Sequence, residues 1–231
     1  MKRIVCSLLL FALLISLCSC NYEAPKADDY KTMKTNLSKD YVAEFMELLG
    51  GEIEGSGLVS GFVLDEEHCY NVTPMQVVAE TNMKIFKFSD SCASFVMLDN
   101  EIYELCGSFG GLGFVNAVPC DFDGDGNKDL LVASSWGSGV HNAVISVFNS
   151  VSKKTTVIYS TPGNIRDDLI IKTFIPAFSS KKPEDVPTHY EIYTAEIEVN
   201  NNNFADLSII ANKSIGSIVV ENGVPVFKPN Q

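Results

Sequence analysis

The chain has 231 residues, 46% of them hydrophobic, which is enough for a domain with a substantial core. With 29 acidic and 17 basic side chains, its net charge of −12 argues against nucleic acid partners and against charge-driven adhesion to anionic lipid. The ordinary apolar fraction also excludes a largely disordered chain.

The first residues have the pattern of a secretory signal. Lys2 and Arg3 precede an apolar run of 14 residues, Ile4–Leu17. A membrane-spanning helix needs about 20 apolar residues, so this shorter run with basic residues before it favours an export signal. No other stretch of the sequence is long and apolar enough to cross a bilayer.

The end of this run, Leu17-Cys18-Ser19-Cys20, has an aliphatic residue, a tolerant position, a small residue and then a cysteine. It resembles the lipobox of bacterial lipoproteins. The resemblance implies cleavage after Ser19, so that residues 1–19 are a signal peptide, and a diacylglycerol and a fatty acid such as palmitate on Cys20. Two or three acyl chains anchor a protein durably, whereas one chain anchors only marginally. We therefore expect an extracytoplasmic protein held on a cell membrane or outer membrane by this lipid alone.

Residues 20–37 are polar and lack an apolar period, which predicts a flexible tether before a single domain over residues 38–231. A helix is expected over Ser38–Leu49, capped by Ser38 or Asp40 and ended by Gly50-Gly51. A second, short helix is expected at Thr73–Gln76, with the threonine as its cap.

Most of the remaining chain predicts strands, because short runs rich in Val, Ile, Phe and Tyr alternate with turn residues. The fold class is therefore mainly β, an α+β chain with one or two short helices, built as an antiparallel sandwich or a partial propeller-like stack of sheets. Asp99-Asn100 and Glu221–Gly223 are the clearest hairpin turns. The expected strands are Leu58–Leu64, Lys84–Phe88, Ser94–Leu98, Ile102–Leu105, Phe114–Val118, Leu130–Ser134, Ala143–Phe148, Thr155–Tyr159, Leu169–Phe174, Tyr190–Val199, Leu207–Ala211, Ser217–Val220 and Val224–Phe227.

One acidic loop has the pattern of a cation site. Oxygen ligands at positions 1, 3 and 5, a glycine at 6, a backbone carbonyl at 7 and a carboxylate at 9 suit a hard cation of the size of Ca²⁺. Without a cation the clustered carboxylates would repel one another. Mg²⁺ or a solvated acidic turn is the alternative. The residues concerned are Asp121, Asp123, Asp125, Gly126, Asn127 and Asp129.

Position 12 of this loop is Val132 and the loop leads into a strand, so the motif is not an EF-hand. The sequence from Phe114 to Phe148, with CDFDGDGNKDLLVAS at its centre, resembles an FG-GAP or VCBS-type repeat. The resemblance implies that Asp121, Asp123, Asp125, the Asn127 carbonyl and Asp129 hold a structural Ca²⁺ in a β-hairpin. A single copy of the acidic loop is present, which does not support an array of such repeats.

The next segment, Ser134–His141, contains the only tryptophan together with glycines, hydroxyls and a histidine. Trp136, Ser138 and His141 are candidate ligand-binding residues for a glycan or protein ligand, on a loop expected near the cation. The alternative is a tight turn with Trp136 packed in the core.

Once the signal is removed and Cys20 is lipidated, four cysteines are left, which predicts either up to two disulfides or buried free thiols. The sequence contains no catalytic motif, so a non-enzymatic binding or envelope-structural domain with a Ca²⁺-stabilised hairpin is the favoured function. An accessory subunit of a surface complex is an alternative, and an extracytoplasmic hydrolase is a weaker one. The four cysteines are Cys69, Cys92, Cys106 and Cys120.

Overall fold

The computed structural model describes seven stretches of the chain, all within one compact unit that begins at Thr32. Among these residues no helix is long and apolar enough to span a membrane. Residues 1–19, Cys20 and most of the expected strand Leu58–Leu64 lie outside them. The described stretches are residues 33–50, 64–106, 110–137, 142–161, 167–174, 189–221 and 223–230.

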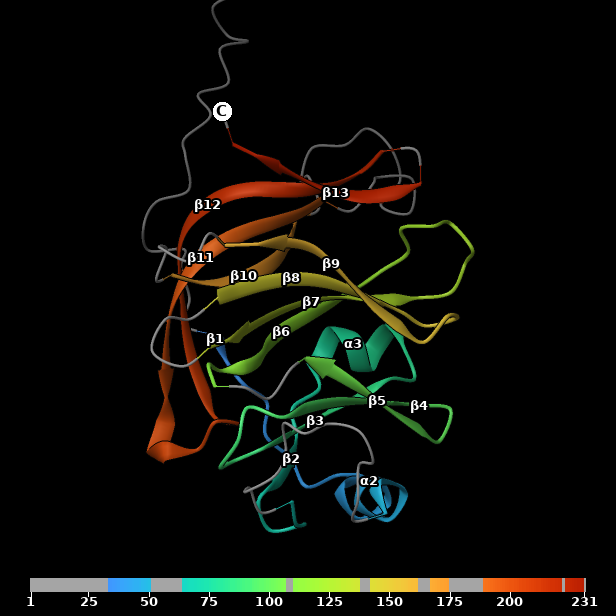
Figure 1. Ribbon diagram of the computed structural model, residues 1–231, viewed down its shortest axis with the longest axis vertical. Helices are drawn as coiled ribbons and strands as arrows, with labels where there is room; N and C mark the ends of the chain where they lie inside the picture. The colour runs from blue at the N-terminus through green and yellow to red at the C-terminus, as the bar shows by residue number, and fades with distance from the viewer. Residues whose placement is uncertain are drawn as a thin grey trace, which may run out of the picture. The chain divides into compact units, whose positions relative to one another are not determined.

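Three antiparallel sheets and two short helices make up the described part, which confirms the predicted mainly β fold (Figure 1). One sheet has the order β2-β3-β4-β5 and a second the order β6-β7-β8-β9. Their strands are β2 (Cys69–Asn71), β3 (Lys84–Phe88), β4 (Ser94–Leu98), β5 (Glu101–Cys106), β6 (Gly113–Cys120), β7 (Asp129–Trp136), β8 (Asn142–Asn149) and β9 (Lys154–Ser160).

The third sheet is organised around one long strand. This strand, β12, pairs with β11 along one edge and with β1 and β13 along different parts of the other edge, and β10 completes the sheet. β1 lies in the sequence that predicted the tether, so that this part of the segment belongs to the sheet. The strands are β1 (Met33–Lys34), β10 (Asp168–Phe174), β11 (His189–Val199), β12 (Leu207–Glu221) and β13 (Val224–Pro229).

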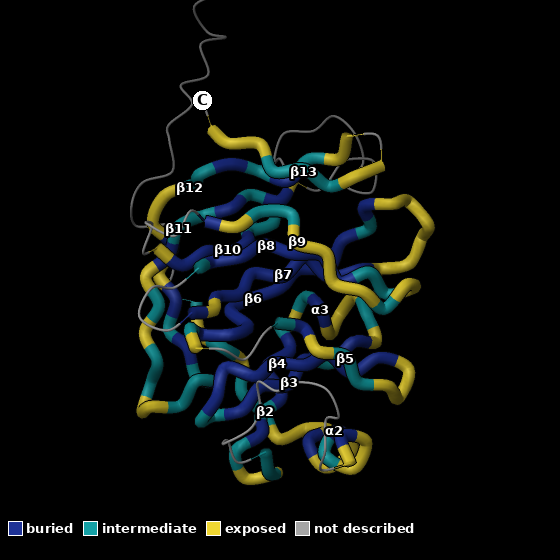
Figure 2. The backbone as a smooth tube through the Cα atoms, in the orientation of Figure 1, coloured by how far each residue is buried: buried dark blue, intermediate teal, exposed yellow. Residues whose placement is uncertain are grey.

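The helices and sheets form stacked layers, with the β6–β9 sheet between the β2–β5 sheet and the sheet that contains β10 (Figure 1). Helix α2 (Val42–Leu49) packs on the β2–β5 sheet through Phe45, whose ring stacks on that of Phe86 at 4.2 Å. Helix α3 (Met75–Glu80) contacts β6, and β10 contacts β6, β7 and β8. The β6–β9 sheet is thus the central layer, and most of β6, β7 and β8 is buried (Figure 2).

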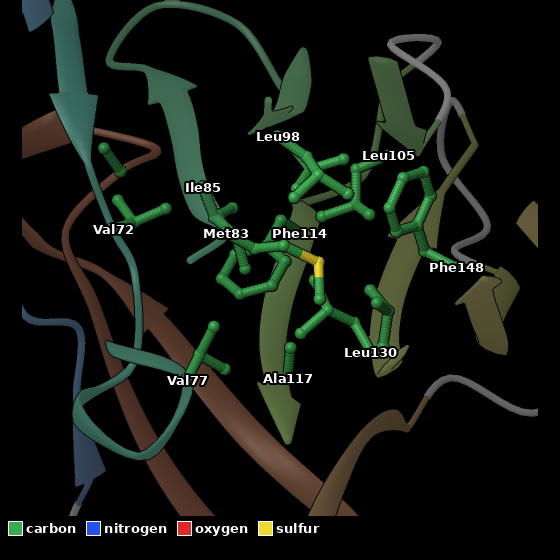
Figure 3. Packing of buried hydrophobic residues seen from close by; sticks show 13 residues of the cluster. Val72, Val77, Met83, Ile85, Leu98, Leu105, Phe114, Ala117, Leu130 and Phe148 are labelled. Atoms are coloured by element: carbon green, nitrogen blue, oxygen red, sulfur yellow. The ribbon is translucent and has the colours of Figure 1, made fainter. Parts of the chain in front are cut away.

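The main core joins the β2–β5 sheet to the β6–β9 sheet. Met83, Phe114 and Leu130 point toward one another, and Leu105 lies beside Phe148 (Figure 3). Each fully buried side chain of this size contributes about 1.5–3 kcal/mol by removal from water. This apolar contact therefore fixes β5 against the inner face of β7 and β8.

The predicted hairpin at Asp99-Asn100 is confirmed, because Leu98 pairs with Glu101 and both turn residues have positive φ, 56° and 61°. That combination is the type I′ turn, whose twist matches that of the flanking strands. Gly50 has φ of 66° and ends α2 as expected.

The predicted starts of both helices are wrong. α2 begins at Val42, because Ser38 pairs with Asn71 in a β-bridge and the Lys39 ammonium donates to the carbonyls of Glu66, Glu67 and Cys69. Neither Ser38 nor Asp40 caps this helix. α3 begins two residues after Thr73, whose hydroxyl instead accepts the Ile85 N–H at 2.8 Å.

Two strand predictions also need correction. One strand, β12, contains both Leu207–Ala211 and Ser217–Val220. The polar residues between them stay in the strand because its pairing with β11 is irregular around Tyr193. β1 and β2 were not predicted, since two or three residues are too few to give a period. All four described cysteines are free thiols, so neither disulfide is present in this part of the chain.

One buried asparagine joins the central sheet to the third sheet. The Asn116 amide nitrogen donates to the Ile171 carbonyl at 2.8 Å, and its oxygen accepts the Ile171 N–H at 3.1 Å. The Asn116 amide therefore makes the two hydrogen bonds with Ile171 of β10 that a neighbouring strand would make.

Replacing Asn116 by Ala leaves both backbone groups of Ile171 without these partners in a buried place. We expect the free energy of unfolding to fall by about 2–4 kcal/mol, since each such group costs about 1–3 kcal/mol. Urea denaturation of N116A measures this loss. The control is N212A, which removes an exposed amide and should change stability by less than about 0.5 kcal/mol. Equal effects of the two changes would contradict the bridging role.

Candidate functional site

The acidic turn, residues 121–128, connects β6 to β7 and brings three of the predicted ligands together. Oxygen atoms of Asp121, Asp123 and Asp125 lie within 4.8 Å of one another. Each carboxylate accepts a backbone N–H of its own turn, from Gly124, Asp125 and Asn127 respectively, at 2.7–3.2 Å. The turn thus holds three carboxylates on one side of a short loop.

The two glycines of the turn are required by the backbone. Gly124 and Gly126 have φ of 72° and 86°, which side chains with a β carbon rarely adopt. A β carbon at either position would contact nothing within 4 Å, so the constraint is conformational and not steric crowding. These positive φ values give the sharp turns that bring the three carboxylates together.

Asp129 has a different place from the other predicted ligands. It is 2% exposed, and its two carboxylate oxygens accept hydrogen bonds from Ser150 N, Ser150 Oγ and Asn149 Nδ2 at 2.8–3.1 Å. The same Asn149 amide also donates to Asp123 at 3.0 Å. Burial raises the pKa of the Asp129 carboxyl, while these donors act in the opposite direction. Asp129 therefore ties the acidic turn to the β8–β9 turn.

A cavity of about 740 Å³ adjoins the acidic turn, between α3, the β4–β5 turn and the β8–β9 turn. The charged groups along it pair with one another. Lys153 contacts Asp99 at 2.9 Å, and this ammonium lowers the pKa of the Asp99 carboxyl; Lys128 lies 3.9 Å from Glu80. These four charged residues therefore neutralise one another in pairs, and none of them offers an unpaired charge to a ligand in the cavity.

A second opening, the Trp136 cleft, lies at the other end of β7. It has a volume of about 360 Å³ and lies between β5 and the inner face of β7, β8 and β9. Trp136 is the last residue of β7, pairs with Asn142 and is 46% exposed, so it is not a core residue. The residues around the cleft are Glu104, Leu105, Cys106, Ser134, Ser135, Trp136, Val144, Ser146, Thr155 and Val157.

The expectation that Trp136 lies near the cation loop is wrong. The acidic turn precedes the first residue of β7, whereas Trp136 is its last residue. Seven steps of about 3.3 Å along the strand separate its first and last residues by roughly 23 Å. The acidic turn and the cleft are therefore distinct sites. Ser138 and His141 lie outside the described residues.

The backbone beneath Trp136 is held by close packing. A β carbon on Gly111, whose φ is 71°, would lie 2.6 Å from Trp136 Cα. Gly110 bridges to Gly137, and the Ser135 hydroxyl accepts the Leu112 N–H at 2.9 Å. The tryptophan is thus presented from a fixed backbone, as preorganised binding sites require.

Behind the cleft, Lys87, Ser94 and Cys106 form a row across β3, β4 and β5, since Lys87 pairs with Ser94 and Ser94 with Cys106. Lys87 is 1% exposed and donates to the Phe114 carbonyl at 2.9 Å, and burial lowers the pKa of its ammonium to about 8. Burial raises the pKa of the Cys106 thiol to about 12. Such a thiol stays protonated at neutral pH and is a poor nucleophile.

The sequence did not identify the cleft residues Ser134 and Ser146 as a pair. A signal was present, because each of the two neighbouring strands has one serine among its inward residues, Ser134 after Val132 on β7 and Ser146 between Val144 and Phe148 on β8. Recognising it requires the register of β7 against β8, which pairs Ser134 with Val144 and Val132 with Ser146. Single-strand patterns do not contain that register.

No protein-family model, curated protein or solved structure matches the chain. The resemblance of residues 114–148 to FG-GAP and VCBS repeats therefore stays a prediction from the sequence.

Changing Asp129 to Ala removes the acceptor of the Ser150 and Asn149 donors in a buried place. In Ca²⁺-free buffer we expect D129A to lower the free energy of unfolding by about 2–4 kcal/mol, because buried donors lose a charged acceptor. Denaturation by urea in the presence of EGTA measures it. The matched change D121A relieves repulsion in an exposed turn and should cost less than about 0.5 kcal/mol. A larger loss for D121A than for D129A would contradict the anchoring role of Asp129.

Proposed function

We propose that this protein is a lipid-anchored extracytoplasmic lipoprotein whose mainly β domain binds a ligand and carries a structural Ca²⁺ in the acidic turn. The observation that carries the ion is the convergence of the Asp121, Asp123 and Asp125 carboxylates within 4.8 Å. The function is binding at a surface, and the ion stabilises the fold.

Electrostatics supports a cation at this turn. Two unit charges 4 Å apart in water repel by about 1 kcal/mol, and by more near a protein surface. Three carboxylates held this close lower the stability of the turn unless a cation neutralises them. Ca²⁺ accepts six to eight oxygen ligands in irregular geometry, whereas Mg²⁺ demands a near-ideal octahedron and retains water, so a turn of carboxylates and carbonyls favours Ca²⁺.

The position of the turn supports a structural role for the ion. The turn joins β6 to β7, whose residues Phe114, Leu130 and Val132 belong to the main core. Asp129 and Asn149 connect the same turn to the end of β8. An ion bound here would hold together the ends of three strands of the central sheet.

The lipid anchor rests on the sequence at Cys20, which follows a short basic segment and an apolar run of export-signal length. With acyl chains on Cys20, the acidic domain would stay at the membrane without any charge attraction to anionic lipid. Extracytoplasmic fluids supply the high Ca²⁺ concentrations that weak extracellular Ca²⁺ modules need.

Ca²⁺ is expected to raise the melting temperature of the protein. With a Kd of about 0.1–1 mM, typical of extracellular modules, about 10 mM Ca²⁺ would stabilise the fold by about 1.4–2.7 kcal/mol. That corresponds to a shift of about 3–10 °C for a domain of this size. Differential scanning calorimetry in EGTA and in Ca²⁺ measures the shift.

The D123A/D125A double variant should lose this shift. The matched control is E66Q/E67Q, which removes the same number of negative charges from an exposed turn and should keep it. Absence of a Ca²⁺-dependent shift in the unaltered protein would overturn the assignment of Ca²⁺. An equal shift in the double variant would place the ion elsewhere.

The anchor predicts a covalent lipid on Cys20. Cells expressing the unaltered chain and fed radiolabelled palmitate should yield a labelled, membrane-bound protein of the size expected after removal of residues 1–19. The C20S variant should incorporate no palmitate, whereas C18S, two residues earlier in the sequence, should still be labelled. Palmitate incorporation into C20S would contradict the proposed anchor site.

A further inference from the structure

The inner face of β7 and β8 changes in character along its length. On β7, Leu130 and Val132 belong to the main core, and the next inward residue is Ser134. On β8, Phe148 belongs to the same core and the next inward residue is Ser146. The apolar face therefore becomes a hydroxyl-bearing face where the two sheets open into the Trp136 cleft.

The two serine hydroxyls lack protein partners. Ser134 is 5% exposed and Ser146 is 3% exposed, yet neither side chain has a hydrogen bond with any described residue. Neighbouring Ser135, by contrast, accepts the Leu112 N–H. Neither oxygen is among the fully buried, unpartnered side-chain atoms of the described residues, so both hydroxyls reach the open space of the cleft and are positioned for a group that enters it.

The tryptophan supplies an apolar surface beside these hydroxyls. The Trp136 indole has no ring contact or hydrogen bond within the described stretches, although it is about half buried. An indole offers a large flat face that gains free energy when an apolar ligand surface covers it. Val144 and Val157 extend this apolar surface on β8 and β9.

Charge and size limit the ligand further. The described residues around the cleft include one acid, Glu104, and no Lys, Arg or His, which disfavours phosphates, sulfates and carboxylates. Glu104 itself pairs with Phe95, whose ring belongs to the cluster that contains α2, so the Glu104 side chain lies on the opposite face of β5 from Leu105 and the cleft. A volume of about 360 Å³ lies near the lower end of the roughly 300–1,000 Å³ range of small-molecule sites.

We propose that the Trp136 cleft binds a neutral saccharide. The apolar C–H face of one pyranose ring would lie on the indole of Trp136, and ring hydroxyls would bond with Ser134 and Ser146. A purely aliphatic ligand would bury the two serine hydroxyls without partners, which sites of this type strongly reject. The inference rests on the proposed function of ligand binding and names the class of ligand.

The single tryptophan of the chain makes the test specific, because intrinsic tryptophan fluorescence reports on this cleft alone. The full chain, purified in detergent, is titrated with neutral trisaccharides of glucose, galactose, mannose and N-acetylglucosamine. We expect at least one of them to shift the emission to shorter wavelength with saturation below about 10 mM. An anionic trigalacturonate and a short-chain fatty alcohol serve as counter-probes and should give no saturable change.

Variants assign the effect to the cleft. By titration calorimetry, S134A and S146A should each weaken the trisaccharide affinity at least fivefold, and W136A should abolish the binding heat. The control T156A alters the adjacent position of β9, outside the residues around the cleft, and should leave the affinity unchanged. Melting temperatures of all variants are measured, so that a misfolded variant is recognised and S134G or S146G replaces it.

Three results would overturn the inference: no saturable signal with any neutral trisaccharide, tighter binding of a counter-probe, or cleavage of the trisaccharide during the titration. Because the acidic turn and the cleft are separate, saccharide binding should persist in EGTA below the melting temperature. If Ca²⁺ still stabilises the protein but no saccharide binds, the ligand class alone is wrong. If saccharide binds but Ca²⁺ has no effect, only the structural ion is wrong.

Discussion

The apolar contact between the β2–β5 sheet and the β6–β9 sheet is the interaction on which the described structure depends. Phe114, Leu130 and Phe148 from one sheet interlock with Ile85 and the other core residues of the facing sheet. Figure 3 shows Leu105 of β5 beside Phe148 of β8. The acidic turn and the Trp136 cleft lie outside this core, at opposite ends of β7.

Those ends differ in chemistry. At the beginning of β7 the chain crowds three carboxylates into one turn and ties the turn to β8 through Asp129. At the end of β7 the two sheets separate, and buried hydroxyls take the place of aliphatic side chains around the half-exposed Trp136. The central sheet thus separates the turn proposed to hold a stabilising ion from the cleft proposed to bind a ligand.

Much of the fold followed from the sequence, because strands and tight turns depend on local patterns. The Asp99-Asn100 hairpin and β3 were predicted from short-range sequence alone, and so was the grouping of Asp121 with its neighbouring acids. The missed features depend on distant partners: Lys39 reaches carbonyls about thirty residues away and shortens α2. The cleft required the register between β7 and β8, which places Ser134 and Ser146 on one face and cannot be read from either strand alone.

In the proposed complex, Trp136 and the hydroxyl-bearing face beside it receive a neutral sugar ring. Saturation-transfer difference NMR on the full chain in Ca²⁺, with a neutral trisaccharide that binds, tests this contact directly. We expect strong saturation of the C–H protons on one face of a single ring, lost in W136A and retained in T156A. Uniform saturation over the whole trisaccharide, or the same pattern in W136A, would contradict it.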